Sequence, residues 1–361
     1  MSESIFLARG KSKNRVIKSA IALQENYFGA GIHIPYILIK GQEKGPRGVV
    51  LSAIHGDELN GIQILHKLTG VIDLENFRGE LLLLPIANVP GFNLHSRYLP
   101  DRRDLNRLFP GQENGSEGSR LAWCLWQKFI QDADFGIDLH SASYNRWNFP
   151  HVRGNMRQEK IRKMAAAFGT KIIIHSKGVK GSLRREAAIR GIPFILFEAG
   201  QTNRFEPDII DISVNGIIGV LNQMKMIPDP AKYENIPSLS TTYYNKSEWI
   251  RADNGGLFVP RHFPGDPVKA EEILGDIHSI HGDITGNVKS NRDGQIIGFN
   301  LHPQVVPGRA LYNIAYSPES ILEPLKKPGA NRPDANGNDG KDGNDKKEKV
   351  KIETPDDHEF I

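Results

Sequence analysis

Two short patterns hold residue types that can bind a metal ion. His55 and Glu58 stand three positions apart in His-Gly-Asp-Glu, directly after the apolar run 49–54. His140 follows a second apolar run, and two imidazoles with one carboxylate are a common zinc ligand set. Three protein ligands leave a fourth position open for water, which is typical of catalytic rather than structural zinc sites. The sequence therefore predicts a catalytic zinc site at His55, Glu58 and His140.

Each pattern has a plainer interpretation when it is taken alone. With 12 His in 361 residues, a chance His-x-x-Glu pair is common. On spacing alone, a solvated Glu58 beside a satisfied His55 is the more frequent arrangement, and His140 is equally well explained as a polar residue that ends a strand. The joint placement of all three at the ends of predicted strands favours the metal site.

Glu198 ends an almost wholly apolar run at 192–197. A buried carboxylate without a partner is costly, so this side chain is either paired or functional. Beside a metal-bound water, partly apolar surroundings raise the pKa of a carboxyl group and suit it to move protons. Glu198 is therefore the predicted catalytic acid and base.

Four arginines gather between the two metal-binding patterns: Arg97, Arg102, Arg103 and Arg107. Guanidinium groups bind carboxylates through paired hydrogen bonds and stabilise developing oxyanions, which implies a substrate with a carboxylate. The alternative is a solvated basic loop with surface ion pairs. That alternative suits Arg102 best and extends to Arg103, which still belongs to the substrate-binding candidates.

These residues need a scaffold that brings distant segments together. Residues from about 47 to 225 alternate apolar runs with helical patterns, which indicates an α/β domain. The predicted strands are 48–54, 80–86, 135–139, 171–174 and 192–197, and the predicted helices are 59–68, 116–129 with Ser116 as the N-cap, and 183–190 with Gly191 as the stop. Ligands bind at the carboxyl ends of strands in open α/β sheets, and the candidates fall there.

The sequence pattern changes after Met226. Pro228-Asp-Pro opens a linker, and short strands alternate with Gly- and Pro-rich turns from about 249 to 315. From Lys326 onward apolar residues are too few to offset the entropy of ordering. We therefore predict a catalytic domain at 1–240, a small β domain at 241–318 and a disordered polar tail at 319–361.

Composition excludes several other classes. A net charge of +4 from interspersed residues gives no basic stripe for nucleic acid or a membrane surface. Cys124 is the only cysteine, which rules out an intramolecular disulfide and a Cys-rich zinc cage, and its apolar helical setting predicts a core residue. No apolar run is long enough to span a bilayer and no secretory signal is evident, so we expect a cytoplasmic protein. A homo-oligomer is left open.

The combined pattern resembles the succinylglutamate desuccinylase and aspartoacylase family, relatives of the zinc carboxypeptidases, over roughly residues 48–200. The matching motifs are His55-Gly-Asp-Glu58, Asp138-Leu-His140, Phe197-Glu198-Ala-Gly and the substrate-loop motif Asp104-Leu-Asn-Arg107-Leu-Phe-Pro-Gly. The resemblance implies a zinc-carboxypeptidase-like mixed sheet flanked by helices, followed by a small all-β, barrel-sandwich-like domain.

The same resemblance implies further roles. Asn106 and Arg107 are expected to bind the substrate carboxylate, and Arg97 to polarise the scissile carbonyl or to bind carboxylate. Asp104 is expected to orient the His55 ring by contacting it on the side away from the metal.

The expected activity is a zinc-dependent deacylase that removes the acyl group from a small N-acylated amino acid, either N-acetyl-diaminobutyrate-like or N-succinyl. A zinc carboxypeptidase acting on short peptides is the alternative. A binding protein that keeps the fold without turnover is a third possibility, which the full set of chemically matched residues disfavours.

Overall fold

The computed structural model describes residues 4–8, 15–25, 29, 31–227, 233 and 241–317. The predicted tail at 319–361 lies outside the described residues. Within the described ranges, no helix is both long enough and apolar enough to cross a membrane. The cytoplasmic location stays a prediction.

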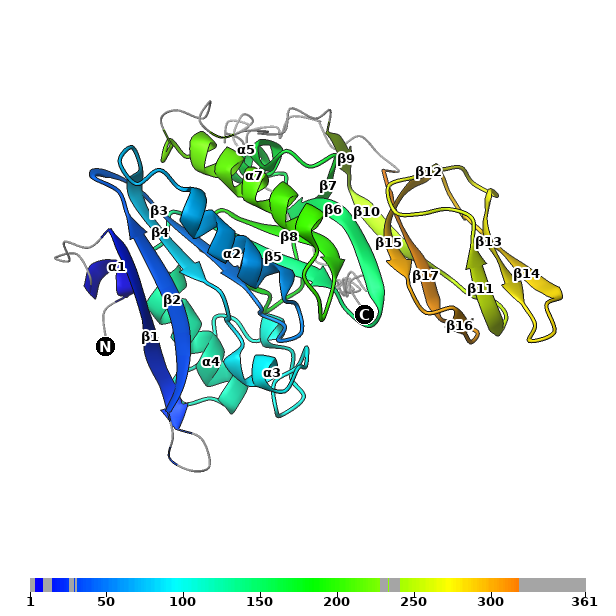
Figure 1. The fold of residues 1–361 in the computed structure, drawn as a ribbon, viewed down its shortest axis with the longest axis horizontal. Helices are drawn as coiled ribbons and strands as arrows, with labels where there is room; N and C mark the ends of the chain where they lie inside the picture. Colours follow the sequence, from blue (N-terminus) through cyan, green and yellow to red (C-terminus); the bar gives the residue numbers. More distant parts are fainter. Residues whose placement is uncertain are drawn as a thin grey trace, which may run out of the picture.

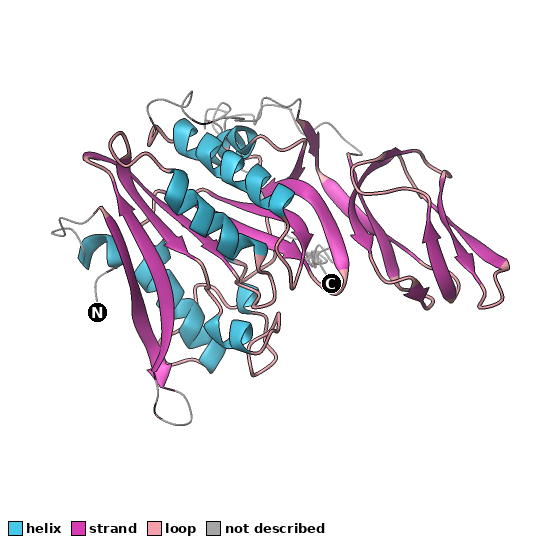
Figure 2. Cartoon of the chain, viewed as in Figure 1, coloured by secondary structure: helices cyan, strands magenta, loops and turns pink. Residues whose placement is uncertain are grey.

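One long mixed sheet runs through the molecule, with helices on both faces (Figures 1 and 2). Its strands follow the order β1-β2-β4-β3-β5-β8-β6-β15-β17-β10. The first seven in that order are β1 (Val16–Glu25), β2 (Gly31–Lys40), β4 (Arg78–Leu84), β3 (Glu43–Ser52), β5 (Phe135–Ala142), β8 (Phe194–Gln201) and β6 (Arg146–Gly154). The centre is parallel, because β3 pairs in parallel with β4 and β5, and β5 with β8. The predicted mixed α/β architecture is confirmed.

Two helical layers bury the faces of this sheet. One layer is formed by α2 (Asn60–Val71), α5 (Glu159–Phe168) and α7 (Pro207–Gln223). The other contains α1 (Ile5–Ala8), α4 (Glu117–Leu125), a π-helical turn at Trp126–Ile130, and α6 (Leu183–Ile189). The short α3 (Val89–Asn93) follows β4. Apolar side chains on both faces explain why the central strands are continuous apolar runs in the sequence.

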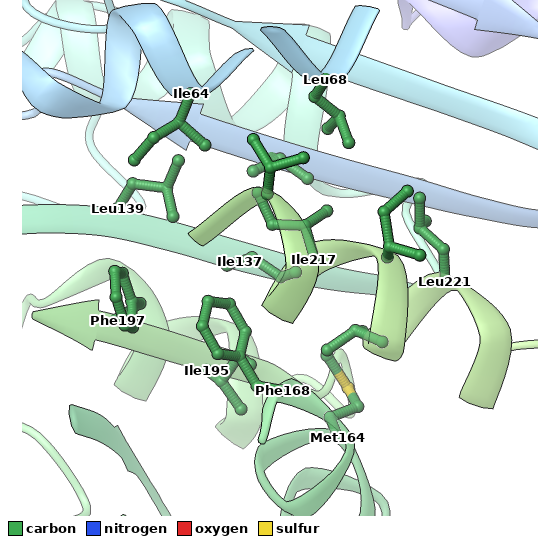
Figure 3. Close-up of a cluster of buried hydrophobic side chains, with 14 of the residues drawn as sticks. Ile64, Leu68, Ile137, Leu139, Met164, Phe168, Ile195, Phe197, Ile217 and Leu221 are labelled. Atoms are coloured by element: carbon green, nitrogen blue, oxygen red, sulfur yellow. The ribbon is translucent and has the colours of Figure 1, made fainter. Parts of the chain in front are cut away.

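The larger core cluster lies between the central strands and the first helical layer (Figure 3). In this view Leu139 of β5 lies next to Ile64 of α2. Phe168 of α5 stacks on Phe197 of β8, with ring centroids 4.6 Å apart. Since Phe197 directly precedes Glu198, this packing fixes the strand that carries the predicted catalytic residue.

The predicted elements of the first 225 residues are confirmed with small shifts in their ends. Run 171–174 corresponds to β7 (Ile172–His175), and the other predicted runs correspond to β3, β4, β5 and β8. Ser116 caps α4, since its hydroxyl accepts a hydrogen bond from the Ser119 amide. Gly191 adopts a φ of +82° just after α6. Cys124 is buried, as predicted, and burial raises the pKa of its thiol.

The C-terminal strands form the predicted β region. A second sheet has the order β14-β13-β11-β16, with bounds Ile284–Lys289, Ile273–His278, Gly256–Pro260 and Gln304–Val305. It packs on a core that includes Phe258, Leu274, Phe299 and Tyr312.

The large sheet continues past the predicted boundary at residue 240. Strands β10 (Lys246–Arg251), β15 (Gly294–Asn300) and β17 (Ala310–Tyr316) extend it, because β15 pairs with β6. The short strands β9 (Thr242–Tyr244) and β12 (Pro267–Val268) add to it through β7 and β15. The division into domains at this position stays a prediction.

The packing of Phe168 gives a stability prediction. Phe168→Ala should reduce the free energy of unfolding by about 3–5 kcal/mol, because the deleted ring leaves a cavity under β8. Urea titration followed by circular dichroism measures the change. Ile189→Ala, at a residue that is 66% exposed on α6, is the matched control and should stay within about 0.5 kcal/mol of the parent. Equal losses in the two variants would contradict the core assignment.

Candidate active site

The parallel register of the central strands brings the predicted residues to one edge. Leu51 of β3 lies opposite Asp138 of β5, and His140 lies opposite Glu198 of β8. The strands run in the same direction, so their carboxyl ends meet at that edge. His140 and Glu198 are therefore neighbours, and the turn after β3 starts beside them.

That turn depends on two unusual backbone positions. Ala53 has a φ of +49°, a left-handed conformation that is uncommon for a residue other than glycine. A Cβ on Gly56 would lie 2.1 Å from the carbonyl carbon of Gly91, so the turn can pack against α3 only with glycine here. The Glu58 amide donates to the His55 carbonyl at 3.2 Å and closes the turn.

His55, Glu58 and His140 form a buried cluster with their ligand atoms converging. Nδ1 of His55 lies 2.6 Å from Oε1 of Glu58, and Nδ1 of His140 lies 3.1 Å from Oε2. One ligand atom from each residue lies within 4.8 Å of the others. Two nitrogens and a carboxylate with this convergence suit a zinc ion.

In both imidazoles, Nε2, the nitrogen that points away from Glu58, faces another carboxylate. Nε2 of His140 lies 2.9 Å from Oδ2 of Asp138, and Nε2 of His55 lies 3.3 Å from Oδ1 of Asp104. A carboxylate behind an imidazole keeps the proton on that nitrogen and leaves the other one free to bind a metal. This is the tautomer that a metal facing both Nδ1 atoms requires, so the donor set fits the group.

The sequence analysis assigned no role to Asp138. The signal was present, because Asp138 and His140 are two positions apart and share one side of a strand. Its role nevertheless depends on how the His140 ring is turned, which spacing does not fix.

Charge compensation holds the cluster together. Burial would raise the pKa of Glu58, but the charges of His55 and His140 hold it well below its ordinary value. The Ser141 amide also donates to Oε2 of Glu58 at 3.0 Å. Burial would lower the pKa of His140, and the charges of Asp138 and Glu58 raise it instead. The structure therefore keeps an ionised carboxylate between two imidazoles.

Glu198 lies beside this cluster and lines the same cavity. Nδ2 of Asn148, from β6, donates to its Oε2 at 3.0 Å. Burial raises the pKa of the Glu198 carboxyl, against the lowering charge of His140. A carboxyl group with a raised pKa beside a cationic centre is suited to proton transfer.

The substrate loop is tied to the cluster through Asp104. Nη2 of Arg97 donates to Oδ2 of Asp104 at 3.0 Å, and Nη1 donates to Oγ of Ser143 at 2.7 Å. Oδ1 of Asp104 accepts from the Asn106 amide at 2.8 Å and starts the single turn Leu105–Arg107. Burial would raise the pKa of Asp104, but the bond to His55 and nearby positive charges lower it. One carboxylate thus orients both His55 and Arg97.

The predicted substrate-binding residues separate into two groups. Asn106 and Arg107 line the cavity, with Oδ1 of Asn106 accepting from the Leu183 amide at 2.8 Å. The structure does not bring Arg103 to the cavity. Its side chain is 55% exposed and donates to Oγ of Ser116, the N-cap of α4, at 2.7 Å.

A cavity of about 160 Å³ opens over the cluster. Among the described residues that line it, arginines outnumber carboxylates, and Glu198 is the only acidic one. Lining residues that the sequence analysis did not select include Arg146, Asn148, Arg153, Ser182, Arg184, Ser247, Trp249 and Asn313. The excess of positive charge suits an anionic ligand.

Fold and site together define an α/β protein with a buried His-Glu-His cluster at the carboxyl edge of parallel strands, and this cluster could hold a metal ion. The model of the succinylglutamate desuccinylase/aspartoacylase catalytic domain matches residues 44–224. The chain belongs to this family, and the resemblance seen in the sequence is confirmed. Membership supports an enzyme that hydrolyses amide bonds.

Individual relatives match more than four fifths of the chain. The N-alpha-acetyl-L-2,4-diaminobutyric acid deacetylase of Halomonas elongata is 24% identical over 315 residues, which cover 84% of this chain and 92% of the relative. The solved succinylglutamate desuccinylase/aspartoacylase from Rhodobacter sphaeroides has a TM-score of 0.74 at 23% identity, covering 86% of this chain and 97% of that one. The product-bound ectoine utilization protein EutE (DoeB) from Ruegeria pomeroyi has a TM-score of 0.73 at 20% identity, covering 85% and 97%. The two solved structures confirm the fold.

The contact behind His140 gives a prediction about metal affinity. Asp138→Asn should weaken Zn²⁺ binding by about 10–100-fold while the protein stays folded, because a neutral amide holds the Nε2 proton of His140 less strongly than a carboxylate does. Competition with a chromophoric chelator measures the affinity. Asp211→Asn, at an exposed position of α7, is the control and should bind zinc like the parent. An unchanged affinity in Asp138→Asn would exclude the orienting role.

Proposed function

We propose that the chain is a zinc-dependent amidohydrolase that removes a small acyl group from an N-acylated amino acid. One observation carries the proposal: His55 and His140, two members of the buried set with Glu58, line the same cavity as Glu198. The three residues can hold a metal, and Glu198 is a separate carboxyl group that does not belong to this set. Zinc bound there would lower the pKa of a water molecule and polarise the scissile carbonyl.

Glu198 is the residue that moves protons in this proposal. It takes the proton of the attacking water and passes it to the leaving amine, which must be protonated to depart. Its hydrogen bond from Asn148 holds the carboxylate in place. The raised pKa brings its proton affinity closer to what this transfer requires.

Arg97 and Arg107 act on the substrate rather than on the water. Asp104 and Ser143 hold the Arg97 guanidinium beside the ligand set, where it can polarise the scissile carbonyl and stabilise the oxyanion. Arg107 and Asn106 lie in the same cavity and bind the carboxylate of the amino-acid part. Arg103 has no part in this arrangement.

The acyl group is a separate question. The curated relative from Halomonas elongata is named as a deacetylase, which supports an acetyl group, whereas the family name also includes desuccinylases. A panel of N-acetyl and N-succinyl amino acids tests the proposal directly. Release of acetate or succinate supports it, and release of a terminal amino acid from short peptides would favour the carboxypeptidase alternative.

Removal of single side chains separates metal binding from chemistry. His55→Ala and His140→Ala should each lose most bound zinc, measured by elemental analysis. Glu198→Gln should keep its zinc and its fold while kcat falls by about a hundredfold or more, because the amide cannot accept a proton. Full zinc occupancy in both histidine variants would refute the ligand assignment. Near-normal turnover in Glu198→Gln would remove that residue from the mechanism.

The role of Arg107 is tested by combining a variant with an altered substrate. Lysine keeps the charge but cannot make a planar paired contact, so Arg107→Lys should raise KM nearly as much as removal of the side chain. Esterifying the substrate carboxylate should cause the same loss in the parent enzyme. Both changes remove the same contact, so their effects on kcat/KM should not add. Esterifying the substrate should therefore lower kcat/KM of the variant only a little further. If the loss in kcat/KM from Arg107→Lys and the loss from esterification multiply when they are combined, another residue binds this carboxylate.

A further inference from the structure

His151 of β6 is a fully buried histidine that lies opposite Glu198 in the pairing of β6 with β8. The register of this pairing shifts between Asn148 and His151, which is a β-bulge. Side chains three positions apart on a regular strand point to opposite faces of the sheet. The bulge instead brings Asn148 and His151 to the face that carries Glu198, because residues opposite each other in a strand pair share a face. Two polar groups of β6 therefore lie on the side of the sheet where Glu198 lies.

The hydrogen bonds of His151 select one neutral form of its ring. Nδ1 lies 2.7 Å from the carbonyl oxygen of Phe149, which can only accept, so Nδ1 carries the proton. Nε of Arg153, which can only donate, lies 3.0 Å from Nε2 of His151, so Nε2 is unprotonated. The pKa of His151 is lowered to about 3, first by burial and then by the charge of Arg153. At neutral pH the ring is therefore uncharged and accepts a hydrogen bond from Arg153.

Arg153 extends into the cavity from the same face of the sheet. It lies opposite Leu196 of β8, and it lines the cavity together with Leu196 and Glu198. A hydrogen bond at Nε restricts the rotation of the guanidinium plane, because Nε joins this plane to the rest of the side chain. Burial raises the pKa of Glu198, and the charge of Arg153 is one of the contributions that oppose it. The guanidinium thus lies close enough to Glu198 to act on its charge.

The two hydrogen bonds of His151 serve different purposes. The bond from Nδ1 satisfies a backbone carbonyl at the bulge, which any short donor side chain could also do. The bond to Nε2 does nothing for the bulge, because its partner, Arg153, belongs to the cavity lining. A buried polar ring is costly, and an apolar residue would fill the same space more favourably. The orientation of Arg153 accounts for the second bond.

We propose that His151 is a positioning residue whose ring holds the guanidinium of Arg153 beside Glu198. The inference rests on the proposed function, in which Glu198 takes a proton from water and passes it to the leaving amine. A guanidinium beside Glu198 stabilises the ionised carboxylate, which is the form that accepts the first proton and the form that remains after the second transfer. Arg153 acts here on Glu198 and not on a carboxylate of the substrate.

Two substitutions of His151 separate its hydrogen bonds in the zinc-loaded full chain. In His151→Asn, the short amide can replace Nδ1 as the donor to Phe149 but ends before the position of Nε2. This variant should lower kcat by about tenfold for the best substrate of the N-acyl panel and leave KM within about twofold, as expected when a charged group loses its orientation in the chemical step. His151→Gln is longer and places an acceptor near Nε2, so it should recover most of kcat. Both variants should bind zinc like the parent.

A double substitution tests whether His151 acts through Arg153. Arg153→Lys keeps the charge but has no Nε–H, so it should lower kcat about as much as His151→Asn does. On this background His151→Asn should lower kcat only a little further, because the shared contact is already absent. His175→Gln is the control, at a half-buried histidine of β7 outside the cavity lining, and it should keep the kcat of the parent.

The proposal is overturned if the losses in kcat multiply in the double variant, or if His151→Gln is as slow as His151→Asn. It is also overturned if KM rises while kcat is kept, because Arg153 would then bind the substrate. If His151→Asn does not fold, Arg153→Lys decides the question. An unchanged kcat in that variant would remove Arg153, and with it the positioning role of His151, from the reaction.

A spectroscopic measurement keeps this inference separate from the proposed function. If the parent hydrolyses no member of the panel, the proposed function fails, whereas NMR of isotopically labelled histidine and arginine nitrogens still tests the positioning. Nε2 of His151 should give the signal of an unprotonated nitrogen. The Nε–H signal of Arg153 should shift in His151→Asn and stay near its parental position in His151→Gln. A protonated Nε2, or an Arg153 signal that His151→Asn leaves unchanged, would refute the positioning role.

Discussion

The buried carboxylate of Glu58 is the constraint on which the site depends. An ionised group at this depth is tolerated only if neighbouring donors and charges replace the water it has lost. His55, His140 and the Ser141 amide do so, and each imidazole is in turn oriented by another carboxylate. The result is a chain of alternating acids and bases whose inner atoms converge. A cation at that point would relieve the same electrostatic demand, which is why the arrangement needed for stability is also suited to metal chemistry.

Parallel pairing determines which segments can take part in this chain of groups. In a parallel sheet the carboxyl ends of neighbouring strands lie at one edge, so β3, β5 and β8 deliver their side chains to one place without any long loop. The register makes His140 and Glu198 direct neighbours. The turn after β3 places the remaining ligand candidate, because Gly56 lets this turn pack against α3 and direct Glu58 inward. Small backbone requirements therefore decide the spacing of the ligands.

The central strands and the site residues at their ends could be predicted from the sequence, because strands buried on both faces are continuous apolar runs. A polar residue at the end of such a run stands out, as His140 does. Strand β6 could not be found in this way, since it contains Pro150 and polar residues without a period of two. Asp138 belongs to a motif that the sequence shows, but its role in orienting His140 could not be predicted, because that role depends on how the His140 ring is turned. Trp249 enters the cavity only through the pairing of β15 with β6, a contact between segments far apart in the chain.

The structure also separates the groups that carry the proposed chemistry from the cavity residues that contact the rest of the substrate. The groups that would bind metal and move protons come from the parallel centre of the sheet, where packing on both faces leaves little freedom. Other cavity residues come from β6 and the C-terminal strands, which meet where Gly298 of β15 pairs with Asn148 of β6. A substitution at Arg146 or Trp249 changes the shape and charge of the cavity and leaves the contacts of Glu58, Asp104 and Asp138 in place. Members of a family with one catalytic arrangement can therefore differ in substrate, and the charge carried by β6 is where such a difference should first be sought.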